Sequence, residues 1–382
     1  MSKRTKSPKP SSSARSAPSI NLPELRQRID AIDRQLVDLL NARSSLVVEV
    51  GKYKQANNIP IYAPHREAEV LSRVLGHNKG PLPNRAVEGV YREIMSGSFA
   101  LEKPLSIGFL GPPGSYSHLA AKRHFGSSVQ FEDLHEIAGV FTEVARGHVD
   151  YGMVPIENSI HGSVAEALDS FAKFHTSVNV YAEVQLEVHH ALLANCAPSM
   201  VRRIYSKPEV FSQCRAWLAT QYPRAEQIAV ASSSKAVQMV AEEKKGTKGS
   251  AAIGSTLAAE LYGVNVLFEK IEDRSDNLTR FFVIARQHAS PSGDDKTSVM
   301  FTTLNKPGAL ARVLADFHDA GVNLTHIDKR PSGRSNWTYT FFIDAQGHRS
   351  DKPMLDALGR AKKHCKELVV LGSYPRSRRI LG

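Results

Sequence analysis

The sequence predicts a multidomain chain in which an all-α helical domain, a larger α/β domain and a small ferredoxin-like α+β domain follow one another. Three observations lead to this prediction. Apolar residues recur at helical spacing over residues 21–103, and short apolar runs alternate with helical patterns over residues 104–286. Residues 297–376 read as strand, helix, strand, strand, helix, strand. The polar stretch from His288 to Lys296 is expected to link the last two domains.

The charge of the chain is concentrated at its ends. The formal net charge is +11, but residues 1–20 are basic and free of acids, and three further arginines lie within residues 376–379. Such tails are usually solvated, so we expect residues 1–20 to be disordered and do not expect nucleic-acid binding. The modest positive balance of the remaining chain suits an enzyme that acts on small anions.

Several classes of protein and site are not expected. No run of eighteen apolar residues could span a membrane, and the first residues lack the apolar core of a secretory signal. The cysteines Cys196, Cys214 and Cys365 are odd in number and far apart, which predicts neither disulfides nor a zinc site and favours a cytoplasmic location. His189 and His190 are neighbours on an expected strand, so they would face opposite sides and not share a metal. We expect no metal and no cofactor.

The all-α domain is predicted to begin with a long amphipathic helix. Asn21 as a cap, Pro23 and Glu24 together mark a helix start. The apolar face is formed by Leu22, Leu25, Ile29, Ile32, Leu36 and Leu39. No proline follows until Pro60, so the helix should exceed thirty residues. Such a helix is too long to stand alone in a small globule, which suggests pairing with another chain.

Basic residues interrupt this apolar face. Arg43 stands where the next apolar residue should be, and Lys54 follows eleven residues later on the same side of the helix. Arg66 and Glu67 open the next expected helix. Taken alone, the pattern favours long basic side chains that extend from the edge of a core into water. The alternative is a site where cations converge on a small polyanion, since arginine binds carboxylates bidentately.

These residues resemble the all-helical chorismate mutase family. The match consists of Leu25-Arg26, Asn41-Ala42-Arg43, Gly51 to Lys54, Arg66-Glu67 and Arg92 to Ser96, and it extends to Glu102. The resemblance implies an intertwined dimer of three-helix chains that rearranges chorismate to prephenate. That pericyclic reaction requires no nucleophile, only a held conformer and stabilised charge.

The resemblance also implies roles for individual residues. Arg43 and Arg66 would bind the substrate carboxylates, and Arg26 would do so from the partner chain. Lys54 would donate to the ether oxygen of the substrate. Glu67 would hold the ring hydroxyl.

Three further positions complete the implied mutase site. Ser98 would assist at a carboxylate. Ala63 departs from the family pattern, in which an aspartate commonly precedes the Arg-Glu pair by three residues. Glu102 occupies a second ether-oxygen position, where some members carry glutamine. Because an ionised carboxylate cannot donate a hydrogen bond, Glu102 would have to be protonated to help, and mutase activity should fall as the pH rises.

The α/β domain opens with a predicted strand at residues 105–110 and a glycine turn that leads into a helix near His118. Backbone N–H groups at such a turn can bind an anion, but the G-x-G-x-x-G dinucleotide pattern is absent. Residues 150–159 are a second predicted strand that ends in a polar cluster. Open α/β sheets place ligands at strand ends, although Asn158 or Ser159 could equally cap a helix.

Together with polar clusters at residues 205–213 and 277–281, these segments resemble prephenate dehydratase over residues 104–286. The combination of Val-Pro-Ile-Glu-Asn at residues 154–158 with Asn-x-Thr-Arg-Phe at residues 277–281 is specific. The resemblance implies two α/β lobes like those of periplasmic binding proteins, with the site in the cleft. The chain should cross between the lobes near residues 185 and 274.

The implied reaction removes carbon dioxide and a ring hydroxyl from prephenate to give phenylpyruvate. By resemblance, Thr279 assists the departing group, and a hydrogen-bonding role is expected because an ordinary threonine is a poor acid. The residues that would orient the substrate or tune that hydroxyl are Glu157, Asn158, Ser206 and Gln213, with Ser115 and Arg280 as weaker candidates.

The last domain resembles the ACT domain that follows dehydratase domains. Its expected strands include an alternating run from Trp337 to Ile343. Gly308-Ala309-Leu310 matches one phenylalanine-binding motif. The second motif, usually Glu-Ser-Arg-Pro, reads Asp328-Lys329-Arg330-Pro331 here, and Asn323 and Leu324 lie at a strand start where ligand contacts are expected. The resemblance implies feedback inhibition by phenylalanine, with a purely structural dimerisation domain as the alternative.

The three resemblances together imply a bifunctional enzyme of phenylalanine biosynthesis that acts on chorismate and prephenate. It would be a homodimer or a higher homo-oligomer, without nucleic-acid or membrane partners. Two alternatives stay open: a dehydratase that prefers arogenate, with the mutase intact, and a non-catalytic two-lobed ligand-binding regulator.

Overall fold

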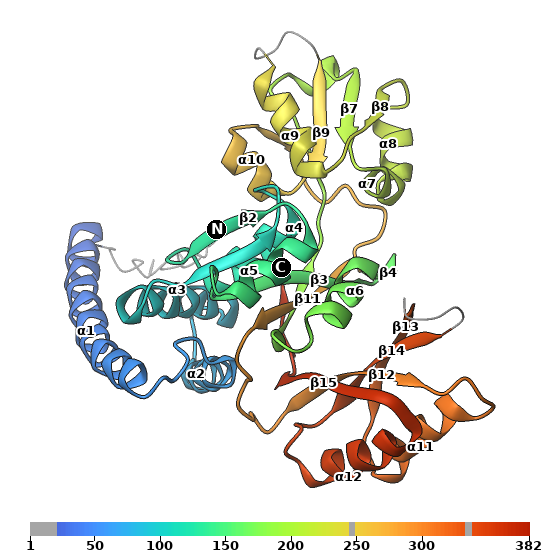
Figure 1. Ribbon diagram of the computed structural model, residues 1–382. Helices are drawn as coiled ribbons and strands as arrows, with labels where there is room; N and C mark the ends of the chain where they lie inside the picture. Colours follow the sequence, from blue (N-terminus) through green and yellow to red (C-terminus); the bar gives the residue numbers. More distant parts are fainter. Residues whose placement is uncertain (1–20, 244–248, 333–337) are drawn as a thin grey trace, which may run out of the picture.

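The computed structural model describes residues 21–243, 249–332 and 338–382, so the predicted tail and Trp337 lie outside the described residues. Three domains follow one another along the chain. In Figure 1 the N-terminal helices lie to the left of a first α/β lobe, a second α/β lobe lies above it, and the C-terminal domain lies below. This order confirms the predicted fold classes.

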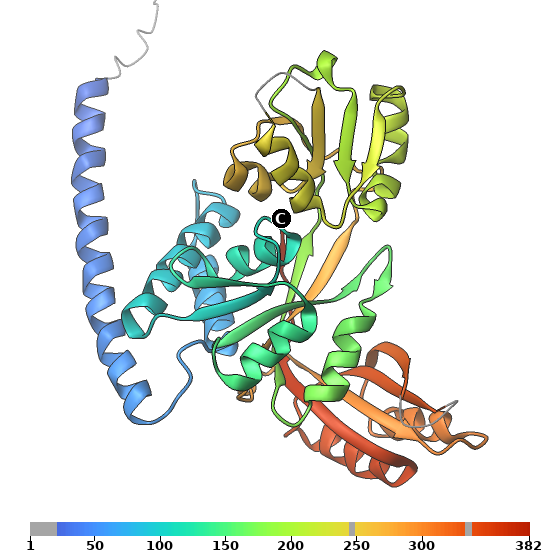
Figure 2. The same ribbon diagram turned by 45° about the horizontal axis from the view of Figure 1, so that its top comes forward.

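The helical domain consists of α1 (Leu22–Ala56), α2 (Pro64–His77) and α3 (Asn84–Glu102). The predicted start of α1 is confirmed, since the Asn21 side chain accepts a hydrogen bond from the backbone N–H of Glu24 at 3.4 Å. The C-terminal part of α1 packs on α3, where Gly51 is buried against Glu102. The rest of α1 extends away from the body of the chain (Figure 2).

The apolar face of α1 is exposed in the single chain. Its residues retain between 41% and 67% of their accessible surface, namely Leu22, Leu25, Ile29, Ile32, Leu36 and Leu39. A contiguous apolar surface of this kind marks an interaction site.

The first α/β lobe contains a sheet of order β16-β5-β11-β3-β1-β2, with β4 paired to β3. Its strands are β1 (Ser106–Leu110), β2 (Gln130–Leu134), β3 (Tyr151–Asn158), β4 (Gly162–Ser163), β5 (Asn179–Glu187), β11 (Leu278–Ala285) and β16 (Ile380–Leu381). Its helices are α4 (Tyr116–Phe125), α5 (Ile137–Arg146) and α6 (Ala165–Phe174). The central strand β11 runs antiparallel to both neighbours, β3 and β5.

The second lobe has its own sheet, of order β10-β6-β9-β7-β8. The strands are β6 (Ala191–Leu193), β7 (Arg203–Ser206), β8 (Glu226–Ala229), β9 (Ser250–Gly254) and β10 (Val266–Phe268). The helices are α7 (Pro208–Gln213), α8 (Arg215–Gln221), α9 (Ser233–Glu242) and α10 (Thr256–Tyr262).

The chain crosses between the lobes at residues 188–190 and 269–277. The second crossing includes residue 274, as predicted. The first lies slightly later than the predicted residue 185, because β5 continues through Glu187 as the partner of Leu278 on β11.

The C-terminal domain has the predicted order of elements around a sheet of order β13-β14-β12-β15. They are β12 (Asp295–Thr303), α11 (Ala309–Asp319), β13 (Leu324–Pro331), β14 (Tyr339–Gln346), α12 (Lys352–Ala361) and β15 (Cys365–Pro375). The predicted linker is shorter than expected, since β12 already begins at Asp295. After β15 the chain returns to the first lobe, where β16 pairs with β5.

The helical domain shares a core with the first lobe through Tyr62, which lies between α1 and α2 and is fully buried. The Tyr181 hydroxyl of β5 donates to the Tyr62 carbonyl at 2.7 Å, and the Tyr62 hydroxyl lies 2.6 Å from His124 Nε2. The Tyr62 ring makes edge contacts with Phe125 and Tyr151 at centroid separations of 5.1 and 5.2 Å. The helical domain is therefore fixed to the sheet that carries the cleft.

Candidate active sites

One set of predicted residues meets where α1 packs on α3. Arg43 Nη1 donates to Ser98 Oγ at 2.8 Å, and Ser98 in turn donates to the carbonyl of Ile94 at 2.9 Å. At one end of this set, the Ser98 hydroxyl therefore orients the Arg43 guanidinium.

The other end of the set is Lys54. Its Nζ donates to Glu102 Oε2 at 2.8 Å and to the carbonyl of Ile61 at 2.9 Å. The Lys54 side chain is 20% exposed and the Glu102 side chain 7%. The ammonium is thus held in place yet remains partly accessible to a ligand. In this arrangement the Glu102 carboxylate is an acceptor.

Helix α2 does not bring its predicted residues to Lys54 in the single chain. Arg66 is 54% exposed and pairs with Glu69 at 2.6 Å. The Glu67 side chain is 10% exposed and forms an ion pair with Arg92 of α3. Sequence patterns did not mark Arg92 as its partner, because the contact joins two helices. The substrate roles of Arg66 and Glu67 stay predictions.

Arg26 cannot act with Arg43 of the same chain on one small ligand. Both lie on α1, separated by seventeen positions, which corresponds to about 26 Å along the helix axis. Ala63, where the family commonly has aspartate, is the cap residue of α2 and contributes no side-chain cap. Its carbonyl accepts from Glu67 N at 3.1 Å, as at an ordinary helix start.

A second cluster lies where β3 ends and β11 begins, next to the segments that connect the two lobes. Asn158 and Thr279 are register partners, and Asn158 Nδ2 donates to Thr279 Oγ1 at 2.9 Å and to Asn277 Oδ1 at 2.8 Å. Asn158 Oδ1 accepts from the backbone N–H groups of Ile160 and His161 at 3.0 and 3.1 Å. These contacts establish that the amide nitrogen of Asn158, and not its oxygen, faces Thr279. Thr279 itself is only 9% exposed.

Gln213 of the second lobe joins this cluster. Asn277 Nδ2 donates to Gln213 Oε1 at 3.3 Å, and Gln213 Nε2 lies 2.9 Å from His161 Nε2. Asn277 therefore connects Gln213 with Asn158. The prediction that Asn158, Gln213 and Thr279 lie together agrees with this geometry, since the contacts join residues from both lobes.

The cluster continues to two residues that sequence reasoning did not assign to it. His190 Nε2 lies 2.6 Å from Gln213 Oε1, and His190 Nδ1 lies 2.6 Å from the Tyr116 hydroxyl. Burial lowers the pKa of His190, so the imidazole is neutral at neutral pH. His189 points elsewhere and contacts Glu272 at 2.7 Å, as expected for neighbours in an extended segment. Among the described residues no group of acidic, histidine and cysteine side chains could hold a metal.

Two predicted hydroxyls have local partners. Ser206 ends β7, is fully buried and donates to the carbonyl of Ile253 at 2.9 Å. Ser115 caps α4 by accepting from His118 N at 3.2 Å, and it donates to the carbonyl of Leu110 at 2.8 Å. Both serines therefore hold the backbone around the cleft in place, and these hydrogen bonds do not reach Thr279.

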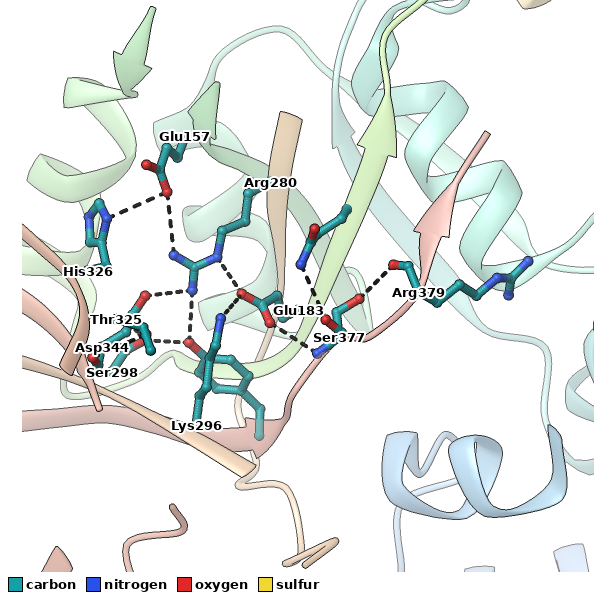
Figure 3. Close-up of polar contacts among 12 residues, drawn as sticks. Glu157, Glu183, Arg280, Lys296, Ser298, Thr325, His326, Asp344, Ser377 and Arg379 are labelled. Carbon is teal, nitrogen blue, oxygen red and sulfur yellow. Dashed lines mark hydrogen bonds and ion pairs between the residues drawn. The ribbon is translucent and has the colours of Figure 1, made fainter. Parts of the chain in front are cut away.

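Glu157 and Arg280 lie on the other face of the sheet. Successive residues of a strand face opposite sides, so their orientation is opposite to that of Asn158 and Thr279. Glu157 Oε2 lies 3.7 Å from Arg280 Nη1 and 3.5 Å from His326 Nδ1 of the C-terminal domain (Figure 3). The structure thus does not bring Glu157 to Thr279, and its catalytic role stays a prediction.

The predicted effector residues lie at element ends of the C-terminal domain. Gly308 caps α11 with a φ of +75°, a conformation that glycine adopts without strain, and Ala309 and Leu310 follow on α11. Leu324 begins β13 directly after Asn323, whose carbonyl accepts from Gln346 N at 2.9 Å.

At the other end of β13, Pro331 is the last residue of the strand, and Arg330 forms a bidentate pair with Asp169 of α6 at 2.7 and 2.9 Å. Arg330 therefore contacts the dehydratase-like lobe in this structure.

Comparison with known proteins finds a family model for each of the three domains. The chain matches the family models for chorismate mutase type II over residues 25–103, prephenate dehydratase over residues 107–289 and the ACT domain over residues 297–362. It is 43% identical over 363 residues to bifunctional chorismate mutase/prephenate dehydratases of Stutzerimonas stutzeri and Pseudomonas aeruginosa. The match covers 93% of this chain and 98% of each relative.

The chain belongs to the bifunctional chorismate mutase/prephenate dehydratase family. The helices α1–α3 are therefore its mutase domain, the two lobes its dehydratase domain and the last four-stranded sheet with its helices its ACT domain.

Two solved structures are also similar to most of this chain. A prephenate dehydratase from Arthrobacter aurescens, in complex with L-Phe, is 31% identical with a TM-score of 0.65, and the match covers 71% of this chain and 90% of that one. A chain described as a novel type of quorum-quenching acylase is 29% identical with the same TM-score, and the match covers 72% and 98% of the two chains.

Proposed function

We propose that the mutase domain converts chorismate to prephenate and that the dehydratase cleft converts prephenate to phenylpyruvate, with phenylalanine as the inhibitor bound by the ACT domain. The observation that carries this proposal is the Asn158–Thr279 hydrogen bond. Because Asn158 donates, Thr279 Oγ1 accepts, and the threonine hydrogen is left to donate to the departing ring hydroxyl. The fixed amide keeps that hydroxyl oriented as the group leaves.

The direct test supplies chorismate to the purified chain, with and without phenylalanine, and follows phenylpyruvate. Phenylpyruvate that appears without phenylalanine and declines with it supports the proposal. A parallel assay with prephenate and arogenate identifies the preferred substrate. If no phenylpyruvate forms, the alternative of a non-catalytic ligand-binding regulator is favoured. The L-Phe complex of the Arthrobacter relative supports the choice of effector.

The proposed mutase mechanism is electrostatic. Lys54 donates to the ether oxygen as the bond breaks, while Arg43 and Ser98 hold a carboxylate at the other end of the set. We propose a cytoplasmic location, supported by three free cysteines, and small-molecule ligands rather than nucleic acid or membrane. No described helix is long and apolar enough to cross a membrane.

The proposed mutase unit is a homodimer in which α1 of each chain completes the other site. The exposed apolar face of α1 and the separation of Arg26 from Arg43 on one helix support this arrangement.

A complementation experiment tests the shared site. Arg26→Ala and Arg43→Ala chains should each lack mutase activity. Co-expressed chains that form mixed dimers should regain about a quarter of the wild-type activity, because half of the dimers are mixed and each contains one intact site. The chains carry different affinity tags, so that mixed dimers can be isolated. Mixed dimers that remain inactive would show that Arg26 does not act across the interface.

A pH profile tests the role of Glu102. Only the protonated carboxyl can donate to the ether oxygen, so wild-type mutase activity should fall as the pH rises. The amide of Glu102→Gln donates at every pH, so the variant should show a flatter profile. The dehydratase activity of the same chain serves as the control. A mutase profile that the substitution leaves unchanged would remove Glu102 from the mechanism.

A further inference from the structure

The residues next to the Asn158–Thr279 pair face the ACT domain. Arg280 follows Thr279 on β11, Glu157 precedes Asn158 on β3, and these two neighbours are themselves register partners. The pairing of β11 with β3 shifts between Arg280 and Phe281. Such a bulge beside a site changes the direction of nearby side chains, so its geometry affects how Thr279 is presented.

Residues of the ACT domain bind the Arg280 guanidinium on the face of the sheet opposite Thr279. Asp344 of β14 lies 2.6 Å from Arg280 Nη2, and Ser298 of β12 donates to the other oxygen of Asp344 at 2.5 Å. Tyr374 of β15 contacts both Ser298 and Arg280, at 2.7 and 3.2 Å. Figure 3 shows the Arg280 guanidinium beside Asp344, with Ser298 next to that carboxylate.

A residue of the first lobe completes the network. Glu183 of β5 accepts from Arg280 Nε at 2.5 Å and from Lys296 Nζ of β12 at 2.8 Å. The side chains of Arg280, Asp344 and Glu183 are 12%, 5% and 0% exposed. His326 of β13 reaches Glu157 from the ACT side. Each neighbour of the catalytic pair is therefore contacted by an ACT residue.

The buried charges persist at neutral pH. Burial alone would raise the pKa of Asp344, but the Arg280 charge and the Ser298 hydrogen bond outweigh it and lower that pKa. The negative charge of Asp344 in turn raises the pKa of Arg280, although burial of the guanidinium would lower it. Removing one member of a buried pair leaves the other charge uncompensated, so the Arg280 guanidinium must shift if Asp344 is neutralised.

We propose that Asp344 and His326 of the ACT domain are positioning residues for the dehydratase reaction, acting through Arg280 and Glu157 on Thr279 and Asn158. The proposal rests on the function assigned to Thr279 above. Its physical basis is that small displacements at a reacting centre are costly, since a misplacement of about 1 Å can reduce a rate about 100-fold.

The test uses Asp344→Asn in the full chain. The amide keeps the shape but removes the charge that holds Arg280. We expect kcat for prephenate to fall about tenfold or more, with KM changed by less than about twofold, because positioning affects the departing group rather than substrate binding. Mutase activity of the same chain should be unchanged, which shows that the mutase domain is folded, and an unchanged thermal unfolding profile shows the same for the other domains.

The matched control is Asp169→Asn. It breaks the exposed Arg330–Asp169 pair, which joins the same two domains away from β11. This variant should keep the dehydratase kcat. An unchanged kcat in Asp344→Asn would overturn the proposal, and so would an equal loss in both variants, since that would reflect domain docking alone.

A second variant decides the matter if Asp344→Asn fails to fold. His326→Gln changes a less buried contact to Glu157, and we expect a fall in kcat of about threefold with KM retained. A kcat equal to that of the wild type would then refute the proposal. A wild-type chain that makes no phenylpyruvate from prephenate would instead refute the proposed function itself.

Discussion

Thr279→Ala should lower the conversion of prephenate to phenylpyruvate about 10³-fold, the upper end of the range found when one hydrogen-bond donor to a transition state is removed. The side chain is buried beside Asn158, which donates to its oxygen. Alanine removes the hydroxyl hydrogen that would stabilise the departing group. Mutase activity should not change, because Arg43 and Lys54 lie in another domain. Both rates can be measured on one preparation, with chorismate and prephenate supplied separately.

Thr279→Ser is the matched variant, since it keeps the hydroxyl and loses only a methyl group. It should retain most of the dehydratase activity. The fold should tolerate both changes, because Asn158 Nδ2 also donates to Asn277 Oδ1 and to the carbonyl of Leu278 at 3.2 Å. If Thr279→Ala retained dehydratase activity, Thr279 would have no part in the mechanism and the proposed role of Asn158 would fail with it.

Periodicity explains what the sequence could predict of the mutase site. Arg43 and Lys54 lie about three turns apart on α1, and Ser98 and Glu102 lie one turn apart on α3. Two helices that pack along one face therefore bring these residues into pairs. Arg66 and Glu67 follow no such rule, because the orientation of α2 depends on Tyr62 and its burial in the first lobe.

The same limit applies in the dehydratase domain. The motif at residues 154–158 lies at a strand end as predicted, and its last residues, Glu157 and Asn158, still belong to β3. Period-two alternation then places Glu157 and Asn158 on opposite faces, which separates residues that the motif presents as one group. His190 and Tyr116 reach the cleft through contacts between distant segments, and no local pattern indicates them.

Contacts between domains were the least predictable feature. The sequence marked residues 376–379 as a basic end, whereas in the structure Arg379 pairs with Glu88 of α3 at 2.6 Å and β16 extends the sheet of the first lobe. The apolar face of α1 is the opposite case. The length and apolar pattern of this helix predict pairing with another chain, and the face stays exposed in the single chain.

Lys54→Ala should reduce the mutase kcat/KM by about 10² to 10³, the usual cost of removing one donor that stabilises charge in a transition state. Lys54 Nζ is held between Glu102 and the carbonyl of Ile61, so the donor is oriented before substrate binds. Dehydratase activity should stay unchanged. Lys52→Ala is the matched control, since Lys52 is an exposed lysine two positions away on the same helix, and it should keep full mutase activity.

A double variant separates loss of the donor from disturbance of its partner. Lys54→Ala leaves the buried Glu102 carboxylate without its counter-charge, and part of the fall could come from that change. Lys54→Ala combined with Glu102→Met removes this uncompensated charge and, unlike Glu102→Gln, adds no amide that could donate to the ether oxygen. If the loss of the donor dominates, the double variant should remain close to the single Lys54→Ala variant in kcat/KM. Recovery to near wild-type activity would show that the ion pair, and not donation by Lys54 to the ether oxygen, governs the mutase rate.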